Sequence, residues 1–156
     1  MPKDLKTELK QNKEFPSKEE ELFLNIIRTA DSLQRSLVEL FKRFDLSPTQ
    51  YNMLRILRGA GEHGSACGEI GERMVTRDPD ITRLVDRLEG RGLVQRSREN
   101  KDRRVITTRI TEDGLKLLAQ IDQPVTDAHH AQLGHLTKKQ MQELIDLLGL
   151  ARDKVN

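Results

Sequence analysis

The segment ITRLVDRLEGRGLVQRSRENKDRRVITTRITEDG, residues 81–114, passes from a helical to an extended pattern within a short length of chain. Its first apolar residues recur at spacings of three and four, as they do on one face of a helix: Ile81, Leu84, Val85 and Leu88. Residues 93–98 and 105–110 then predict two short strands, the second rich in β-branched side chains. The charged residues ENKDR join them, so the segment predicts a helix followed by a two-stranded ribbon with a charged tip.

The helix in this segment has clear end signals. Asp78 is placed to cap its N-terminus, Pro79 suits the first helical position, and Gly90 or Gly92 ends it. Its polar residues gather on the face opposite the apolar stripe: Thr82, Arg83, Asp86 and Arg87. We therefore expect an amphipathic helix with a cationic outer face.

Two helices are predicted directly upstream. Ser47, Pro48 and Gln50 supply a cap, a first helical residue and the reciprocal side chain of a capping box, and this helix runs until GAGEHG. A shorter helix is predicted around CGEIGERM. Together, residues 47–110 have the order of a helix-turn-helix followed by a two-stranded wing.

Long helices are predicted on both sides of this unit. Ser17 with Glu20 forms a capping box, and an apolar stripe then runs from Phe23 to Phe44 over about seven turns.

The C-terminal side holds two more helices. Thr111 caps the first, in which Pro124 is expected to cause a kink or a division. Thr137 and Gln140 form the capping box of the last.

The predicted fold class is mostly α with a small β-ribbon. We expect a flexible N-terminal arm at 1–16, a dimerisation helix at 17–46, a winged helix-turn-helix at 47–110 and C-terminal dimerisation helices at 111–156. The flanking helices carry more apolar surface than a monomer of 156 residues could easily cover. They are therefore expected to pack on a second copy of the chain, forming a homodimer.

Charge is unevenly distributed along the chain. The net charge is +2, but the window from Arg73 to Arg109 holds ten Arg and one Lys against six acidic residues, a local +5. The planar fork of arginine suits phosphates and guanine edges, so a nucleic-acid partner is favoured. A solvated face rich in ion pairs is the alternative.

Other features narrow the class of protein. The single cysteine, Cys67, gives no disulfide framework, and no apolar run is long enough to span a bilayer. We expect a cytoplasmic protein without a membrane segment. GAGEHGSACG lacks the preceding strand and the lysine of a phosphate-binding loop, so catalysis is not expected, nor is a cofactor.

Three stretches carry a family resemblance: LSPTQYNMLRIL, ITRLVDRLEGRGLVQR and NKDRRVITTRITEDG. In order and spacing they resemble the MarR (multiple antibiotic resistance regulator) family of winged-helix transcription factors. The resemblance covers residues 18–154. The linked set of T-R-x-x-D-R-L-E, D-x-R and I-T-x-x-G is far more specific than any one motif.

The resemblance implies that residues at the start and along the outer face of the fourth helix enter the major groove of double-stranded DNA. The matching positions here are Thr76, Arg77, Asp80, Thr82, Arg83 and Arg87. For the arginines, surface ion pairs with Asp80, Asp86 or Glu89 are the alternative.

The wing residues implied for DNA contact are Arg98, Lys101, Asp102, Arg103 and Arg104. In the family's D-x-R signature the arginine reaches the minor groove and the aspartate orients it, which maps onto Arg104 and Asp102. Arg103 is expected to reach phosphate, although either arginine could be the one that enters the groove. Alternatively, a charged tip protects the edge of a small sheet.

The expected function is a homodimeric, sequence-specific regulator, most simply a repressor, on a pseudo-palindromic operator. The resemblance implies release by a small aromatic or phenolic effector in a pocket between the dimerisation helices and the winged-helix unit. The candidate lining residues are Leu33, Leu37, Tyr51, Met53, His129 and His130.

Alternatives of other classes stay open at this point. The winged helix could instead bind an acidic protein partner. Cys67 could sense oxidants, and His129, His130 and His135 could sense a metal, although they lack the spacing of a metal site.

Overall fold

The computed structural model describes residues 4–77, 80–98 and 104–154. Its elements in chain order are α1 (Leu5–Glu8), α2 (Lys18–Lys42), α3 (Pro48–Ala60), a 3₁₀ turn (Gly61–His63), β1 (Ser65–Ala66), α4 (Cys67–Arg73), α5 (Ile81–Gly90), β2 (Val94–Ser97), β3 (Thr107–Ile110), α6 (Glu112–Leu133) and α7 (Lys138–Arg152). The predicted class, mostly helical with a small sheet, is confirmed. Within the described ranges, no helix is long and apolar enough to cross a membrane.

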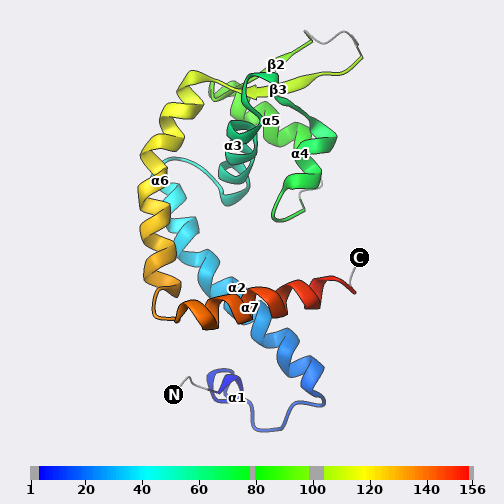
Figure 1. Cartoon of the computed structure of the whole chain (residues 1–156), viewed down its shortest axis with the longest axis vertical. Coiled ribbons are helices and arrows are strands. Elements are labelled where there is room, and N and C mark those ends of the chain that lie inside the picture. The colour runs from blue at the N-terminus through cyan, green and yellow to red at the C-terminus, as the bar shows by residue number, and fades with distance from the viewer. Residues whose placement is uncertain (1–3, 78–79, 99–103, 155–156) are drawn as a thin grey trace.

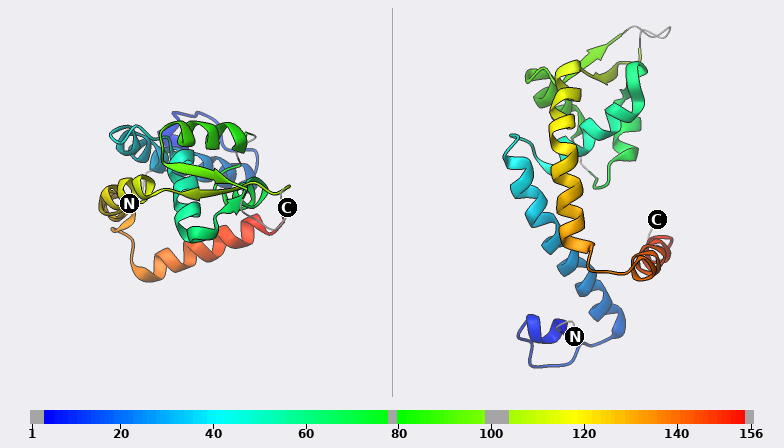
Figure 2. Two further views of the ribbon diagram at one scale, coloured as in Figure 1. Left: turned by 90° about the horizontal axis from the view of Figure 1, so that it is seen from above. Right: turned by 60° about the vertical axis from the view of Figure 1, so that its left-hand side comes forward.

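The molecule has a compact body at one end and long helices leading away from it (Figure 1). The body consists of α3, α4, α5 and the sheet, and the β2–β3 ribbon extends beyond it. α6 starts at the ribbon and runs beside α2, and the views of Figure 2 show the same pairing. α7 follows at the far end of α6, away from the body.

The sheet has the strand order β1-β3-β2, and both pairings are antiparallel. Thr108 of β3 lies between Ser65 of β1 and Arg96 of β2. β1 was not predicted, because two residues are too few to show an alternating pattern. Gly64 precedes it with φ +65°, and a Cβ there would collide with the Thr108 carbonyl, so this close approach of the strands requires glycine.

One hydrophobic core joins the body to the long helices. Its side chains without exposed surface come from α3, α4, α5 and α6: Met53, Leu54, Leu57, Ile70, Val85, Leu88, Leu118 and Ile121. At the end of α2, Phe41 stacks on Tyr51 of α3 with ring centroids 4.4 Å apart. Arg58 of α3 donates to both carboxylate oxygens of Asp122 in α6, at 2.8 and 3.0 Å. The winged-helix body is therefore fixed to α2 and α6.

The N-caps predicted for four helices are confirmed. In each, a hydroxyl accepts the backbone N–H three residues later: Ser17, Ser47, Thr111 and Thr137. The prediction for α5 is wrong, because the helix begins at Ile81 and its cap is Asp80, which accepts the Arg83 N–H at 2.9 Å. Asp78 and Asp80 both suit an N-cap by residue type, and the proline pattern favoured the earlier position. Asp78 and Pro79 lie outside the described residues.

Pro124 does not divide α6, which is continuous from Glu112 to Leu133. Proline has no N–H to donate to the preceding turn, so an isolated helix would be weakened there. Ile121 and Val125, on either side of it, are both buried in the core. This packing holds both halves in one helix.

The described part of the N-terminal arm is folded rather than free. Leu5 of α1 is buried, and Glu8 Oε2 lies 3.8 Å from Arg28 Nε of α2. Asp4 caps α1 by accepting the Lys6 N–H at 3.4 Å. The expected flexible arm therefore includes a one-turn helix placed against α2.

Candidate nucleic-acid interface

α5 has one face in the core and the opposite face in solvent. Its buried residues are Leu84, Val85 and Leu88. The residues on the other face are exposed: Thr82, Arg83, Asp86 and Arg87. A single exposed helix carrying arginines is the element that the major groove of DNA can admit.

The loop before α5 also faces solvent. Thr76 and Arg77 are exposed, and Val75 keeps 87% of its surface accessible. The backbone N–H of Val75 donates to Asn52 Oδ1 of α3 at 2.8 Å, and the preceding Met74 is buried. The loop is thus anchored to the body and presents its side chains beside the start of α5.

The acidic residues of α5 are paired with an arginine of the wing. Arg96 of β2 donates from Nη1 to Glu89 Oε1 at 2.8 Å and forms an ion pair with Asp86. The predicted alternative was that Arg83 and Arg87 form these pairs. Within the described ranges neither arginine forms an ion pair, so their guanidinium groups face solvent with their charge uncompensated by contact.

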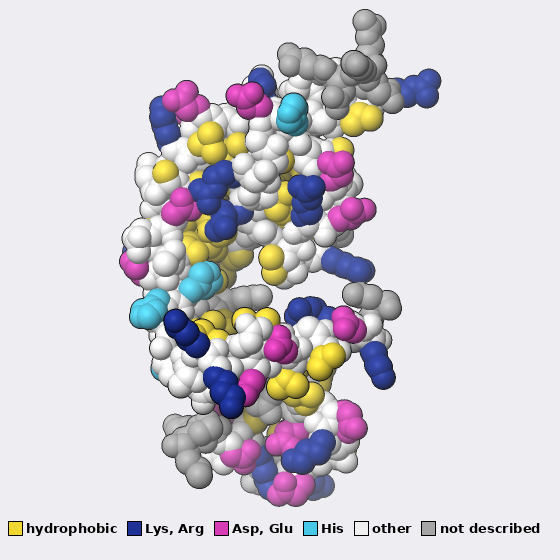
Figure 3. All heavy atoms as spheres, in the orientation of Figure 1, with side chains coloured by type: hydrophobic (Ala, Val, Ile, Leu, Met, Phe, Trp, Pro, Cys, Tyr) yellow, Lys and Arg dark blue, Asp and Glu magenta, His cyan; other side chains and the backbone are white. Residues whose placement is uncertain are grey.

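The wing carries exposed cations at its outer end. Arg98 follows β2 and Arg104 precedes β3, and both are exposed. The space-filling view shows basic side chains at this end of the molecule (Figure 3). The other predicted wing residues, Lys101, Asp102 and Arg103, lie outside the described residues.

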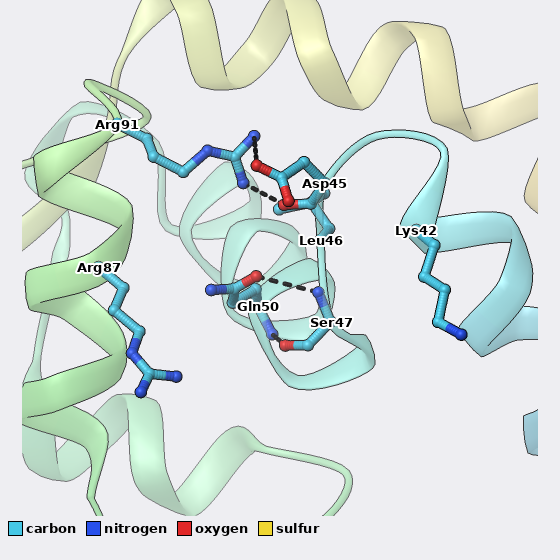
Figure 4. Close-up of a pocket in the computed structure, with 7 residues that line it drawn as sticks. All are labelled: Lys42, Asp45, Leu46, Ser47, Gln50, Arg87 and Arg91. Atoms are coloured by element: carbon cyan, nitrogen blue, oxygen red, sulfur yellow. Dashed lines mark hydrogen bonds and ion pairs between the residues drawn. The ribbon is translucent and has the colours of Figure 1, made fainter.

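A pocket of about 440 Å³ lies where α2 ends, α3 begins and α5 ends. Its lining residues are Lys42, Asp45, Leu46, Ser47, Gln50, Arg87 and Arg91. Arg87 and Arg91 lie on one side of it and Lys42 on the other (Figure 4). Arg91 donates to the Phe44 carbonyl at 3.3 Å and also to the Asp45 carbonyl. Three basic residues against one acidic residue make this a cationic pocket.

The six residues predicted for a ligand pocket do not line this one. Met53 has no exposed surface, and its side chain belongs to the core. Tyr51 is stacked on Phe41, while Leu33 and Leu37 are half-buried along α2. His129 and His130 are exposed on α6.

The sensing alternatives gain no geometric support. Cys67 is half-buried at the start of α4. His129, His130 and His135 are all exposed. Within the described parts of the chain, no three His, Cys, Asp or Glu side chains are close enough to hold a metal ion.

Sequence reasoning missed Arg96, Arg91 and Lys42. For Arg96 the available signal was its place inside a predicted strand directly after the helix that carries Asp86 and Glu89. Arg91 comes just after the apolar stripe of α5 and Lys42 lies in the last turn of α2, so both look like ordinary surface cations. Only the fold brings the ends of α2 and α5 together.

Comparison with known proteins agrees with this geometry. A family model described as the MarR family matches residues 46–106. The crystal structure of a MarR transcription factor from Planctomyces limnophilus shares 44% identity with a TM-score of 0.67, covering 88% of this chain and 99% of that one.

Two further relatives are informative. The crystal structure of a mutant MarR from E. coli complexed with operator DNA shares 25% identity with a TM-score of 0.75, covering 83% of this chain and 92% of that one. The HTH-type transcriptional repressor IacR of Pseudomonas putida is 29% identical over 131 residues, which are 84% of this chain and 77% of that protein.

Three observations agree on the family of this chain. They are the winged helix-turn-helix, its exposed cationic face and the 44% identity over nearly the whole length of a relative. The chain belongs to the MarR family and is a DNA-binding transcriptional regulator rather than an enzyme.

Proposed function

We propose that this regulator is a homodimeric repressor that binds a pseudo-palindromic operator through α5 and the wing and is released by a small aromatic anion. The distribution of ion pairs on α5 supports the DNA contact best. Arg96 neutralises Asp86 and Glu89, while Arg83 and Arg87 stay available on the same helix.

In the proposed complex, α5 and the loop before it lie in the major groove. Arg83 and Arg87 are one turn apart, and either can donate two hydrogen bonds to a guanine edge or clamp a phosphate. Thr76, Arg77 and Thr82 flank them on the exposed side. Asp80 caps α5 through its carboxylate, so its proposed contribution is to place the start of the helix.

The wing is proposed to reach the neighbouring minor groove. Arg98 and Arg104 are exposed at the two ends of its tip. An arginine in a narrow minor groove senses shape and negative potential rather than base identity. Asp102 and Arg104 are proposed as the orienting and inserting pair, with Arg103 on phosphate and Lys101 as a further DNA contact.

The homodimer is supported by apolar surface on the long helices. α7 spans 15 residues yet has no buried residue in the single chain. Its exposed apolar side chains are Leu144, Ile145, Leu147 and Leu150, and α2 adds Leu22, Phe23 and Ile27. Such faces need a partner surface, and a second copy supplies it with two-fold symmetry. The two α5 helices would then meet half-sites about 10 base pairs apart.

The effector is proposed to bind in the cationic pocket formed by Lys42, Arg87 and Arg91. A carboxylate suits these three cations, and Leu46 offers apolar contact to a ring. Because Arg87 also belongs to the exposed face of α5, an anion held there competes with its use on DNA. Binding would thereby shift the protein toward the state that does not bind DNA.

DNA binding is tested by titrating a duplex selected from a random pool across a salt series. The affinity of the unaltered protein should fall steeply with salt. Arg83→Ala should weaken binding by about 1–3 kcal/mol, whereas Arg35→Ala, which removes an exposed arginine from α2, should not. Absence of duplex binding at low salt would contradict the proposal.

The effector role is tested with 4-hydroxybenzoate and with phenol, which lacks the carboxylate. Only the acid should release DNA, and Lys42→Gln should require a higher concentration of it. Equal release by both compounds would overturn the assignment of the anion to this pocket, while leaving DNA binding itself intact.

A further inference from the structure

Arg96 of β2 contacts α5 through its backbone N–H and through both terminal nitrogens of its guanidinium. Its backbone N–H donates to Glu89 Oε2 at 2.8 Å, and Nη1 donates to Glu89 Oε1 at 2.8 Å. Nη2 donates to the Thr82 carbonyl at 3.4 Å and contacts the Asp86 carboxylate. One side chain of β2 therefore holds three positions of α5, spread over two turns.

These contacts join the two elements that are proposed to meet DNA. Thr82, Asp86 and Glu89 follow one another at spacings of four and three, so they form one line along α5. Arg96 lies opposite Thr108, in the central register of the β2–β3 ribbon. Leu88, Leu93 and Val94 already join α5 to the root of the wing through the core, and the Arg96 guanidinium adds a polar link on the exposed side.

The charge balance supports an engaged rather than a solvated arginine. The Arg96 side chain is only 27% exposed, and its main partners are two carboxylates. The Asp86 carboxylate, assisted by Glu89, raises the pKa of Arg96 above its ordinary value despite partial burial. The planar guanidinium presents five donors in a fixed fork, so it reaches these acceptors at set angles, whereas a lysine ammonium has three donors around a single nitrogen.

We propose that Arg96 is a positioning residue, which fixes the wing relative to α5 so that both reach DNA in one register without touching DNA itself. This inference rests on the proposed DNA-binding function. Its consequence is specific: without the Arg96 contacts, α5 can still enter the major groove, but the wing is no longer held where the minor groove lies.

The test separates the two grooves. On an operator selected from a random duplex pool, protection of guanine N7 from methylation reports α5 in the major groove. Protection of the backbone from hydroxyl radicals reports the wing in the minor groove. At saturating protein, Arg96→Met should keep the guanine N7 protection and lose the hydroxyl-radical protection. Its operator affinity should fall roughly tenfold.

A second variant cuts the same contacts from the α5 side. Asp86→Ala with Glu89→Ala leaves Arg96 in place, removes both carboxylate acceptors and deletes two negative charges, which by electrostatics alone would tighten DNA binding. If Arg96 positions the wing, this variant should instead lose protection of the minor groove, even though its net charge favours DNA binding. Both substitutions are on the helix surface, so this variant is expected to fold. It therefore tests the positioning role even if Arg96→Met does not fold.

The matched control is Arg109→Met. Arg109 lies on β3 opposite Gln95 and contacts its side chain at 3.5 Å. Removing it takes one charge from the same ribbon, and both protections should persist. Full wing protection in the Asp86→Ala/Glu89→Ala variant would overturn the positioning role. Absence of any protection by the unaltered protein would instead contradict the DNA-binding proposal.

Discussion

Thr108 lies in the centre of the sheet with no exposed surface, and its hydroxyl has no hydrogen-bond partner among the described residues. An unpaired buried hydroxyl costs about 1–3 kcal/mol of desolvation. Valine keeps the shape and removes the polar atom, so Thr108→Val should raise the free energy of unfolding by about 1 kcal/mol in urea denaturation. Thr107→Val, at a half-buried neighbouring site, should change it little. A loss of stability in Thr108→Val would mean that the hydroxyl is hydrogen-bonded.

Arg104 offers a second test at a single residue. It is exposed at the base of the wing tip, away from the core. Arg104→Ala should therefore weaken operator binding by about 1–3 kcal/mol, as loss of a groove contact does, and leave the melting temperature and helicity unchanged. Fluorescence anisotropy and circular dichroism measure the two effects. A fall of several degrees in melting temperature would show a structural role.

Gly114 is the glycine of the I-T-x-x-G motif, and its surroundings at the start of α6 show why a glycine is needed there. It lies in the first turn of α6, where a Cβ would collide with the Leu93 carbonyl and the Ile110 side chain. Gly114→Ala should therefore lower the free energy of unfolding by about 1–3 kcal/mol, although alanine favours helix. Gly59 of α3 has open space around it, so Gly59→Ala should raise stability by up to about 1 kcal/mol. Equal effects in urea denaturation would contradict the packing argument.

The link between α3 and α6 predicts a pH dependence. The hydrogen bonds from Arg58 hold the pKa of Asp122 below its ordinary value. A lowered native pKa contributes stability that is present above about pH 4 and is lost as pH falls through the native pKa. The difference in thermal stability between the unaltered protein and Asp122→Asn should therefore be largest near neutral pH and shrink below about pH 4. A constant difference would contradict this role of the ion pair.

Local signals predicted most elements, because capping boxes and apolar spacing depend on neighbouring residues. Ser47 with Gln50 and Thr137 with Gln140 define helix starts without tertiary information. β1 was not predicted because its two residues form a strand only by pairing with β3, which lies about 40 residues later in the chain. The division of α6 expected at Pro124 does not occur, because burial on both sides outweighs a lost hydrogen bond.

The site was predictable only in part, for a related reason. The exposed face of α5 follows from helical period, so Arg83 and Arg87 could be placed. The partner of Asp86 and Glu89 could not, because Arg96 reaches them from a strand whose angle to α5 is a tertiary property. The pocket at Lys42 and Arg91 likewise exists only where the ends of α2 and α5 meet.

At the scale of the whole molecule, the arginine-rich window and the apolar faces of α7 and α2 lie at different ends. The described part of the arginine-rich window, residues 73–109, includes α5, β2 and most of β3 at one end. Exposed apolar side chains lie over α7 and the lower part of α2, at the other end (Figure 3). A monomer would leave these apolar faces in water. In the proposed homodimer, association through them would direct two cationic ends toward one DNA duplex.

This arrangement predicts that DNA affinity depends on a contact far from DNA. Leu144 and Leu147 lie one turn apart on the exposed apolar face of α7. Leu144→Asp with Leu147→Asp should yield a monomer, because burying two carboxylates at an apolar interface is strongly unfavourable. Sedimentation equilibrium measures the change, and Leu147→Met, which keeps the surface apolar, should stay dimeric.

The same monomer should bind operator much more weakly while its winged-helix body stays folded. Two linked half-site contacts exceed one by roughly 10²–10⁴ in affinity, so the loss should fall in that range on a full operator. On a duplex with a single half-site the monomer and the unaltered protein should differ far less, because only one contact is available to either. Unchanged affinity of a proven monomer for the full operator would show that each chain binds DNA independently, and the proposed two-fold reading of the operator would then be wrong.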